Sequence, residues 1–344
     1  MSRLDAAPEI ADLAEELGVG GAAPVDGILN YCRRRIDGWV AEAGVVTNID
    51  ALESLVTARL QMVFEEIRSD EDFDRLTGVY ARGKKEFVFA GMRTKFDDAD
   101  NPTYGALVQR RNAGPTDPDR FVAVIDSRGG KLARRFFTRW HEIAHRLTTH
   151  ADLLAPVYRS EHDPLERLMD EIAGHVGFYE PIFHPAFRRA SDGKPHLAFG
   201  TVESVISGAF PAASFQATLF ACTRQMPTPV VYLEATLAHK KDVKRKLATP
   251  SLFGDAPPPG ELRAVKAIPN KAAQREGFTI PTNMRVPADS LIHRLFDAEP
   301  QTTGDREEDL GQWETQGRPL EKRAVVVEGR KVANRVIAIM QPMS

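Results

Sequence analysis

The sequence predicts a protein of the α+β class, in which helices and short strands occupy separate stretches of the chain. Apolar residues recur at helical spacing over much of residues 10–67 and again over 135–178. Between these stretches, Phe121–Asp126 has the continuous apolar run of a buried strand, and Pro227–Leu233 is strand-like in the C-terminal third. Helices and strands that are segregated along the chain are typical of α+β architecture.

Length and composition are those of an ordinary globular protein. The chain has 344 residues, enough for two or three domains, and a formal net charge of -3, which gives no general attraction to nucleic acid or anionic membrane. The two cysteines, Cys32 and Cys222, imply no disulfide framework, and the acidic N-terminus does not resemble a signal peptide. No apolar run reaches membrane-spanning length. We therefore expect a cytoplasmic protein with no membrane partner.

The first part of the chain is predicted to be helical. A short polar helix is expected from Ile10 to Leu17, and an amphipathic helix from Pro24 to about Leu55. Residues 50–76 continue the helical spacing, with an apolar stripe formed by Leu52, Leu55, Val56, Leu60, Val63 and Ile67. The charged remainder of this stretch is interpreted as a solvated face.

Short strands are predicted next. Gly78–Ala81 and Glu86–Ala90 flank the polar turn Arg82–Lys85, an arrangement that predicts a β-hairpin. Ala106–Val108 is expected to be a short strand and Phe121–Asp126 a buried one. A small β-sheet thus leads into the helix that follows.

That helix carries a metal-binding motif. Residues 131–150 contain neither Pro nor Gly, and they include the His-Glu-x-x-His sequence of residues 141–145. Residues four apart share a helix face, so His141 and His145 can direct both imidazoles to one zinc ion. Glu142 stands where such helices carry the general base that deprotonates the attacking water. The bare motif can arise by chance among nine histidines, so the prediction needs a third ligand.

The third ligand is expected on the next predicted helix, about Pro164 to Phe178. Pro164 suits a first helical position. Glu166 and Asp170 lie four residues apart and therefore share a face. One carboxylate from this face would complete a His/His/carboxylate site and leave a fourth metal position open.

The loop between the two helices, Thr148–Asp163, contains further candidates. Tyr158 and His162 could each donate a hydrogen bond to a tetrahedral oxyanion. Ordinary surface residues are the simpler interpretation of both. His150 is interpreted as an exposed residue at a helix end.

The two motif helices resemble those of the ImmA/IrrE family of bacterial metallopeptidases, which includes radiation-response regulators. The likeness lies in RRFFTRWHEIAHRL, residues 134–147, and in LERLMDEIAGHVGFYEP, residues 165–181. It implies a zincin-like core in which His141, His145 and Glu166 hold zinc, with manganese as the alternative metal. It also implies that Asp170 contacts one of the metal ligands and does not bind the metal itself.

Two positions depart from the family pattern. Met169 replaces a common Cys, a change of no consequence for the site. Gly177–Glu180 replaces an apolar run before Pro181, which concerns the end of the helix and not its metal face.

The resemblance continues with fewer matching residues. Residues 197–226 are similar to a helix-turn-helix segment, with the turn at Gly208–Pro211. Pro227–Leu233 is similar to the strand that opens a GAF-like domain, a fold used for sensing, and Leu262–Ala267 and Arg335–Met340 are strand-like. The acidic stretch Glu299–Gly317 is interpreted as a mobile loop.

Three domains follow from this resemblance. Residues 1–190 would combine the N-terminal helices with the metallopeptidase domain. Residues 191–226 would form the helical segment, and residues 227–344 the C-terminal sensor-type α/β domain, with a possible sensor ligand.

The expected function is that of a zinc-dependent metalloendopeptidase. The resemblance implies that its substrate is a helix-turn-helix repressor, cleaved to switch on a stress or mobile-element response. One alternative is a non-catalytic transcription regulator that binds DNA or protein through its helix-turn-helix and C-terminal domains. Another is a different hydrolase built on a zinc-binding helix. The basic run His239–Lys246 fits phosphate contact and a solvated helix end equally well, which leaves DNA binding open.

Overall fold

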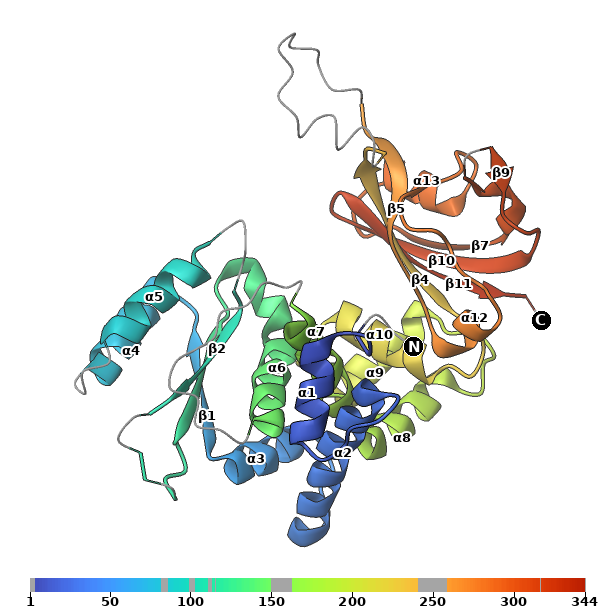
Figure 1. Ribbon diagram of the computed structural model, residues 1–344. Helices are drawn as coiled ribbons and strands as arrows, with labels where there is room; N and C mark the ends of the chain where they lie inside the picture. Colours follow the sequence, from blue (N-terminus) through green and yellow to red (C-terminus); the bar gives the residue numbers. More distant parts are fainter. Residues whose placement is uncertain are drawn as a thin grey trace. The chain divides into compact units, whose positions relative to one another are not determined.

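The computed structural model describes residues 4–81, 86–98, 103–110, 113–114, 116–149, 163–240, 259–315 and 317–343. It contains both helices and β-sheets, so the predicted mixture of α and β structure is confirmed (Figure 1). The chain divides into two compact units. Unit 1 comprises Met1–Ala190 and Glu203–Thr218, and unit 2 comprises Ser191–Val202 and Leu219–Ser344.

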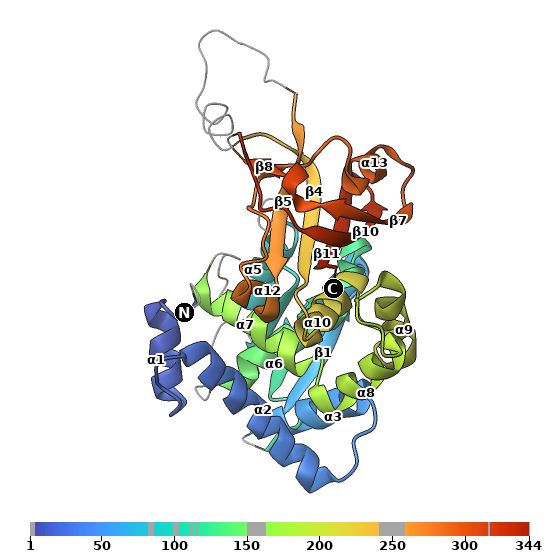
Figure 2. The same ribbon diagram turned by 90° about the vertical axis from the view of Figure 1, so that its right-hand side faces the viewer.

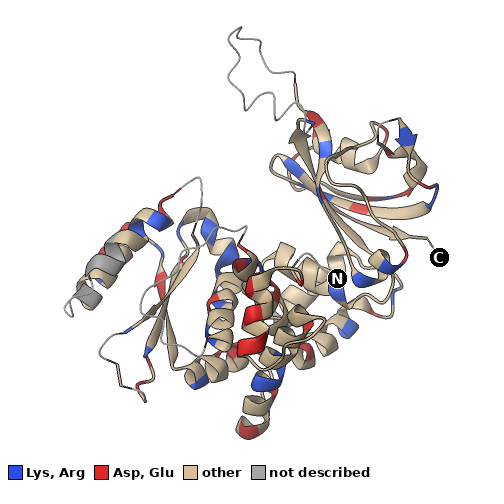
Figure 3. Ribbon diagram, in the orientation of Figure 1, with Lys and Arg blue, Asp and Glu red and all other residues tan. Residues whose placement is uncertain are grey.

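Unit 1 begins with three helices, α1 (Pro8–Glu16), α2 (Pro24–Ala43) and α3 (Ile49–Leu60). Proline stands at the start of α1 and α2, where its missing N–H costs no hydrogen bond. The acidic residues of α1 lie on its exposed side, visible as red segments in Figure 3. The predicted N-terminal helices are confirmed, but α2 ends earlier than expected because Gly44 leaves the helix with a φ of 89°.

A three-stranded sheet follows, with strand order β1-β3-β2. It contains β1 (Met62–Ile67), β2 (Gly105–Gln109) and β3 (Phe121–Asp126), so the strands predicted at 106–108 and 121–126 are confirmed. The central strand β3 pairs in parallel with β1 and antiparallel with β2. Among the described residues β2 has no second strand partner and is therefore an edge of this sheet.

Residues 62–67 were expected to continue a helix, and that prediction is wrong. The helix α3 stops because Gln61 adopts a left-handed conformation with a φ of 54°. The chain then pairs with β3, for example Val63 with Val122 and Phe64 with Ala123. This pairing joins residues far apart in the sequence, and it outweighs the local helical spacing.

The predicted hairpin at residues 78–90 is also wrong. The structure has two helices there, α4 (Asp70–Ala81) and α5 (Glu86–Phe96), while residues 82–85 lie outside the described part of the chain. Acidic residues occupy the first turn of α4, and basic residues occupy the last turn of α5. Each set of charges interacts favourably with the helix dipole at that end of its helix. One apolar cluster packs these helices onto a single face of the sheet, and its members include Phe73, Leu76, Met92, Phe96, Val122 and Val124.

The helices that carry the motif and its expected third ligand are α6 (Arg135–Thr148) and α7 (Pro164–Val176), both as predicted. A 3-10 turn, Gly129–Arg134, connects β3 to α6. The next helix, α8 (Glu180–Ser191), was not predicted, and it contains Pro185 in its interior. Local sequence disfavours such a helix. It is held by packing, because Phe183 is fully buried among aromatic rings.

The unusual residues after α7 have a packing explanation. Gly177 leaves room for the ring of Trp140, since a Cβ at Gly177 would lie 2.9 Å from two atoms of that ring. Phe178 packs against Phe136 and Phe210 at ring-centroid distances of 5.4 and 5.1 Å. These contacts replace the apolar run that the family pattern has at this place.

The segment predicted as a helix-turn-helix does contain two helices, α9 (Phe199–Ala209) and α10 (Phe215–Gln225). Each of them contributes residues to both compact units, since unit 1 takes residues 203–218.

Unit 2 is built on a six-stranded antiparallel sheet with the order β6-β5-β4-β11-β10-β7. Its longest strands, β4 (Val231–Ala238), β5 (Glu261–Pro269), β10 (Ala324–Val332) and β11 (Arg335–Pro342), lie side by side in Figures 1 and 2. The predicted strands at 227–233, 262–267 and 335–340 fall on β4, β5 and β11. One face packs on a core that contains Trp313 and residues of the short helices α12 (Lys271–Arg275) and α13 (Leu291–Asp297).

The mobile loop predicted for residues 299–317 is wrong over most of its length. It contains β7 (Thr303–Asp309), which pairs along β10, and the two-residue strand β8 (Glu314–Thr315), which pairs with β9 (Arg318–Pro319). The strand β7 is charged because it forms the edge of the sheet, and Glu308 is its one buried carboxylate. Charged residues on an edge strand prevent pairing with other chains.

The other face of this sheet is covered from within the same unit. The backbone of Leu197 makes two hydrogen bonds of 2.8 Å with the amide of Gln341, and the N–H of Phe199 donates to Glu328. Phe220 of α10 packs on Tyr232 of β4 at 4.6 Å. Within the described residues, no helix combines the length and apolar character that a membrane span requires.

Candidate metal centre

The helix α6 presents three different faces. Trp140, Ala144 and Leu147 are fully buried and anchor it in unit 1. Thr138 and Glu142 point towards the first residue of β2, as shown by the space that Gly105 leaves for them. His141 and His145 lie on a third face, opposite α7. The helical period therefore separates the two histidines from the glutamate between them.

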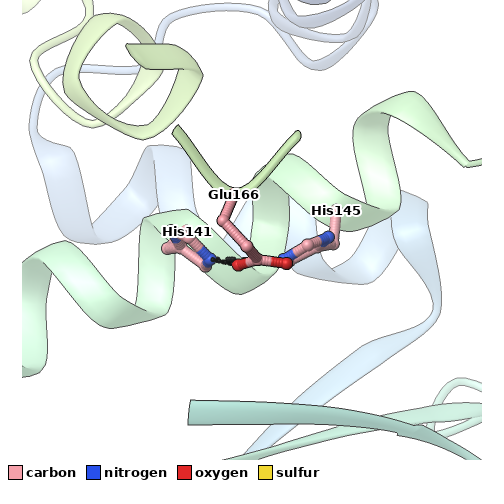
Figure 4. Close-up of side chains that lie close together, drawn as sticks. All are labelled: His141, His145 and Glu166. Atoms are coloured by element: carbon pink, nitrogen blue, oxygen red, sulfur yellow. Dashed lines mark hydrogen bonds and ion pairs between the residues drawn. The ribbon is translucent and has the colours of Figure 1, made fainter. Parts of the chain in front are cut away.

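The helix α7 supplies the third side chain of the cluster. Its N-cap is Asp163, whose carboxylate accepts a hydrogen bond from the N–H of Leu165, and Pro164 opens the first turn. Glu166 follows in that first turn and reaches across to α6. Figure 4 shows both imidazoles directed at its carboxylate.

The three potential ligand atoms lie close together. His141 Nε2 is 3.1 Å from Glu166 Oε2 and 3.2 Å from His145 Nε2. His145 Nε2 is 3.6 Å from the same oxygen of Glu166. Among the described residues, these three side chains form the cluster of His and carboxylate groups that could hold a metal ion.

These separations match those of ligands around one ion. Donor atoms bound tetrahedrally to zinc at its usual bond lengths are separated from each other by roughly 3.3 Å. The three observed distances fall close to this value on all sides of the triangle. Two imidazoles and one carboxylate are also a donor set that suits zinc. The residues present therefore fit such an ion, with one position left for water or substrate.

Asp170 lies behind the first histidine. Its Oδ1 is 2.8 Å from Nδ1 of His141, so it accepts that N–H and leaves Nε2 facing the cluster. The structure thus brings Asp170 into contact with His141. The side chain is about half exposed, in contrast to the three clustered residues.

Hydrogen bonds within the cluster shift the pKa values of His141 and Glu166 in opposite directions. Burial disfavours a charged His141, but hydrogen bonds with Asp170 and Glu166 outweigh it and raise the pKa of His141 to about 10. Burial acts to raise the pKa of Glu166, but hydrogen bonds with His141 and His145 lower it to about 2. The carboxylate is therefore ionised and ready to bind a cation, while a proton must leave His141 when a metal binds.

Glu142 has a different environment. It is 4% exposed, and burial raises the pKa of its carboxyl group against the opposing effect of the two histidines. A carboxylate with a raised pKa is a stronger base, which is the property that a general base needs. Gly105 of β2 lies against it, because a Cβ built at Gly105 would overlap Oε1 of Glu142.

Two other predicted site residues, Tyr158 and His162, lie outside the described residues, as does His150. The structure also reveals two contributors that the sequence did not predict, Gly105 and Thr138, which border Glu142. Nothing in the local sequence marks them, because their role depends on how β2 packs against α6.

Neither a scan against protein-family models nor a search of curated proteins finds a match to this sequence. The geometry of the cluster of His141, His145 and Glu166 is therefore the main indication of function.

Proposed function

We propose that this chain is a zinc-dependent endopeptidase similar to the ImmA/IrrE metallopeptidases. The observation that carries the proposal is the triangle of His141, His145 and Glu166, whose donor atoms are separated by metal-site distances. A buried glutamate, Glu142, stands directly beside it in the chain. This combination is the one that metal-assisted hydrolysis requires.

Each residue has a defined role in this proposal. His141, His145 and Glu166 hold the ion, and Asp170 fixes the tautomer of His141. Zinc, when bound, supplies Lewis-acid polarisation of the scissile carbonyl and a lowered pKa for the attacking water. Glu142 accepts a proton from that water and delivers it to the leaving amine.

The strand β2 provides a place for a peptide. It is an edge strand among the described residues, and its first residue, Gly105, borders Glu142. An extended peptide can pair with such an edge through main-chain hydrogen bonds. The position of the edge beside the proposed base favours a peptide substrate over a small hydrolysable molecule.

The resemblance supplies the wider proposal. Unit 1 would be a zincin-like core, and unit 2 a GAF-like sensor domain with its own ligand. The substrate would be a cytoplasmic helix-turn-helix repressor, cleaved in a stress or mobile-element response, and manganese could replace zinc. These statements extend the geometric argument by family likeness alone.

The alternative of a DNA-binding regulator receives less support. In a helix-turn-helix the second helix must present a free face to the groove. Here the second helix, α10, packs Phe220 on Tyr232. The buried Asn270 donates hydrogen bonds to the carbonyl of Thr223 in its last turn and to the carbonyl of Met226 just after it. The pair α9–α10 is therefore better explained as a packing unit.

The test compares the wild-type chain with Glu142→Gln. Both proteins are loaded with zinc and incubated with a peptide library prepared from a bacterial proteome, and new termini are read by mass spectrometry. We expect cleavage by the wild type, a loss of roughly a thousandfold in the variant, and an unchanged zinc content. Equal cleavage by both proteins, or none by either, would contradict the proposal.

A further inference from the structure

Gly105 occupies a position where a side chain would strike the proposed general base. A Cβ at this residue would overlap Oε1 of Glu142, and it would lie 3.1 Å from Cδ of Glu142 and 2.7 Å from Cγ2 of Thr138. Real Cβ atoms essentially never come as close to other atoms as this Cβ would to Oε1 of Glu142 and Cγ2 of Thr138. The space next to Gly105 is therefore filled by Glu142 and Thr138.

The requirement for glycine here is one of space and not of backbone conformation. Gly105 is absent from the glycines with positive φ, and it lies in regular antiparallel pairing with Ile125 of β3. Alanine could adopt the same backbone at no conformational cost. Only the neighbouring side chains oppose it.

The atoms that would have to move are side-chain ends. Helix α6 and strand β2 could stay in place if the Glu142 carboxylate and the Thr138 methyl group shifted. Glu142 is 4% exposed, so its carboxylate has little free space into which it can move. A methyl group at residue 105 would thus act mainly on the position of the carboxylate.

From this geometry we infer that Gly105 is a positioning residue: it lets the Glu142 carboxylate lie against the edge strand, beside the cluster of His141, His145 and Glu166. The inference rests on the proposed function, in which Glu142 is the general base. Displacement of a catalytic group by about 1 Å is enough to lower a rate roughly a hundredfold. Gly105 itself contacts no ligand atom of the cluster.

The experiment compares zinc-loaded Gly105→Ala with the wild type and with Gly91→Ala. Gly91 lies in α5, and nothing lies within 4 Å of a Cβ at that position, which makes it a matched control for an added methyl group. We expect Gly105→Ala to retain zinc and to lower kcat for a library peptide roughly a hundredfold with little change in KM. Gly91→Ala should behave as the wild type does.

A second readout does not depend on cleavage. Acetohydroxamic acid, a metal-binding probe whose hydroxyl group can donate to Glu142, is titrated into each zinc-loaded protein by calorimetry. Loss of one charge-assisted hydrogen bond predicts affinity about tenfold weaker in Gly105→Ala and equally weak in Glu142→Gln. If the wild type cleaves no peptide, the proposed function fails, yet this titration still decides the role of Gly105.

A compensating variant separates positioning from packing. Glu142→Asp shortens the side chain by one methylene and should lower kcat by itself, because it withdraws the carboxylate from its position. It also moves the carboxylate away from residue 105, so adding Gly105→Ala should cost much less in the Glu142→Asp background than in the wild type. Wild-type kcat and hydroxamate affinity in Gly105→Ala would overturn the inference. If Gly105→Ala does not fold, Thr138→Ser is added to remove the methyl contact, and failure of that double variant to fold would show a packing role only.

Discussion

At the scale of single residues, the sequence predicts that His141 and His145 lie close to a carboxylate of the next helix, and the structure brings His141, His145 and Glu166 together. The spacing of His141 and His145 places them one turn apart, and the pair Glu166 and Asp170 shares a face for the same reason. The helical spacing alone does not distinguish Glu166 from Asp170, and only the family resemblance favours Glu166. In the structure, Glu166 lies with the two histidines. The proximity of Gly105 to Glu142 could not be predicted, since it depends on tertiary packing.

Asp170 offers a test of the support behind His141. Removal of the carboxylate in Asp170→Ala should leave the His141 ring without its 2.8 Å partner and weaken zinc affinity roughly ten- to a hundredfold. Equilibrium competition with a coloured chelator measures this affinity. Glu171→Ala, which removes the adjacent exposed carboxylate on α7, should have no effect. Equal losses in both variants would indicate general electrostatics and not a specific hydrogen bond.

Gly177 offers a test of packing beside the cluster. An alanine there would press its methyl group against the Trp140 ring and the Ala173 carbonyl, at 2.9 and 2.8 Å. Overpacking of this kind should lower the free energy of unfolding by about 1–3 kcal/mol. Urea unfolding of Gly177→Ala checks this value, with Gly91→Ala as the control expected to be neutral or slightly stabilised. An unchanged midpoint for Gly177→Ala would show that Trp140 can move away.

At the scale of elements, the wrong predictions share one cause. Residues 62–67 and 303–309 form strands through pairing with distant partners, β3 and β10, and their own sequences are helical in spacing or highly charged. Residues 86–90 are rich in strand-forming side chains, yet α5 forms because helix brings Met92 and Phe96 onto the sheet. Tertiary contacts overrode local preference in each case.

The end of β3 carries an ion-pair network that joins several elements. Asp126, which is buried, accepts hydrogen bonds from Arg128 and Lys131 at 2.6–2.9 Å, and Arg128 also reaches Asp70 and Asp97. Desolvation acts to raise the pKa of Asp126, but these cationic donors lower it below its ordinary value. The network thus stabilises the ionised carboxylate.

This network predicts a pH dependence of stability. Because the pKa of Asp126 is lower in the folded chain than in the unfolded chain, its contribution is complete above the unfolded value of about 3.9 and is lost as pH falls through the folded value. Asp126→Asn should cost roughly 2–3 kcal/mol at pH 7. Urea unfolding of both proteins between pH 7 and pH 2 should show a constant difference down to about pH 4 and a shrinking difference below it. A difference that is constant with pH would contradict the assignment.

At the scale of the whole molecule, residues 191–226 do not form a unit of their own. Residues 203–218 belong to unit 1, and the rest of this segment belongs to unit 2. Residues 191–202 and 219–226 pack on the sheet of unit 2 through Leu197, Phe199 and Phe220. The sequence could not show this, because the residues that receive them, such as Gln341, are far away in the chain. A domain that begins at residue 227 lacks these contacts.

Fragments of the chain test this organisation. A fragment of residues 191–344 retains Leu197 and Phe220, which contact Gln341 and Tyr232 on one face of the sheet. A fragment of residues 227–344 lacks them and exposes that face. We expect the longer fragment to unfold cooperatively at a higher temperature and the shorter one to aggregate, because exposed apolar sheet promotes association. Circular dichroism and light scattering measure the two properties. Equal stability of the fragments would show that the covering segment contributes nothing.

The proposed metal site of His141, His145 and Glu166 can be tested by binding alone. Equilibrium dialysis against zinc, followed by elemental analysis, compares the wild type with His145→Ala and Glu166→Ala. We expect about one equivalent of tightly bound zinc in the wild type and a loss of most of it in either variant, since each variant removes one of three protein ligands. A wild-type chain that binds neither zinc nor manganese, or variants that bind as much zinc as the wild type, would rule out the site.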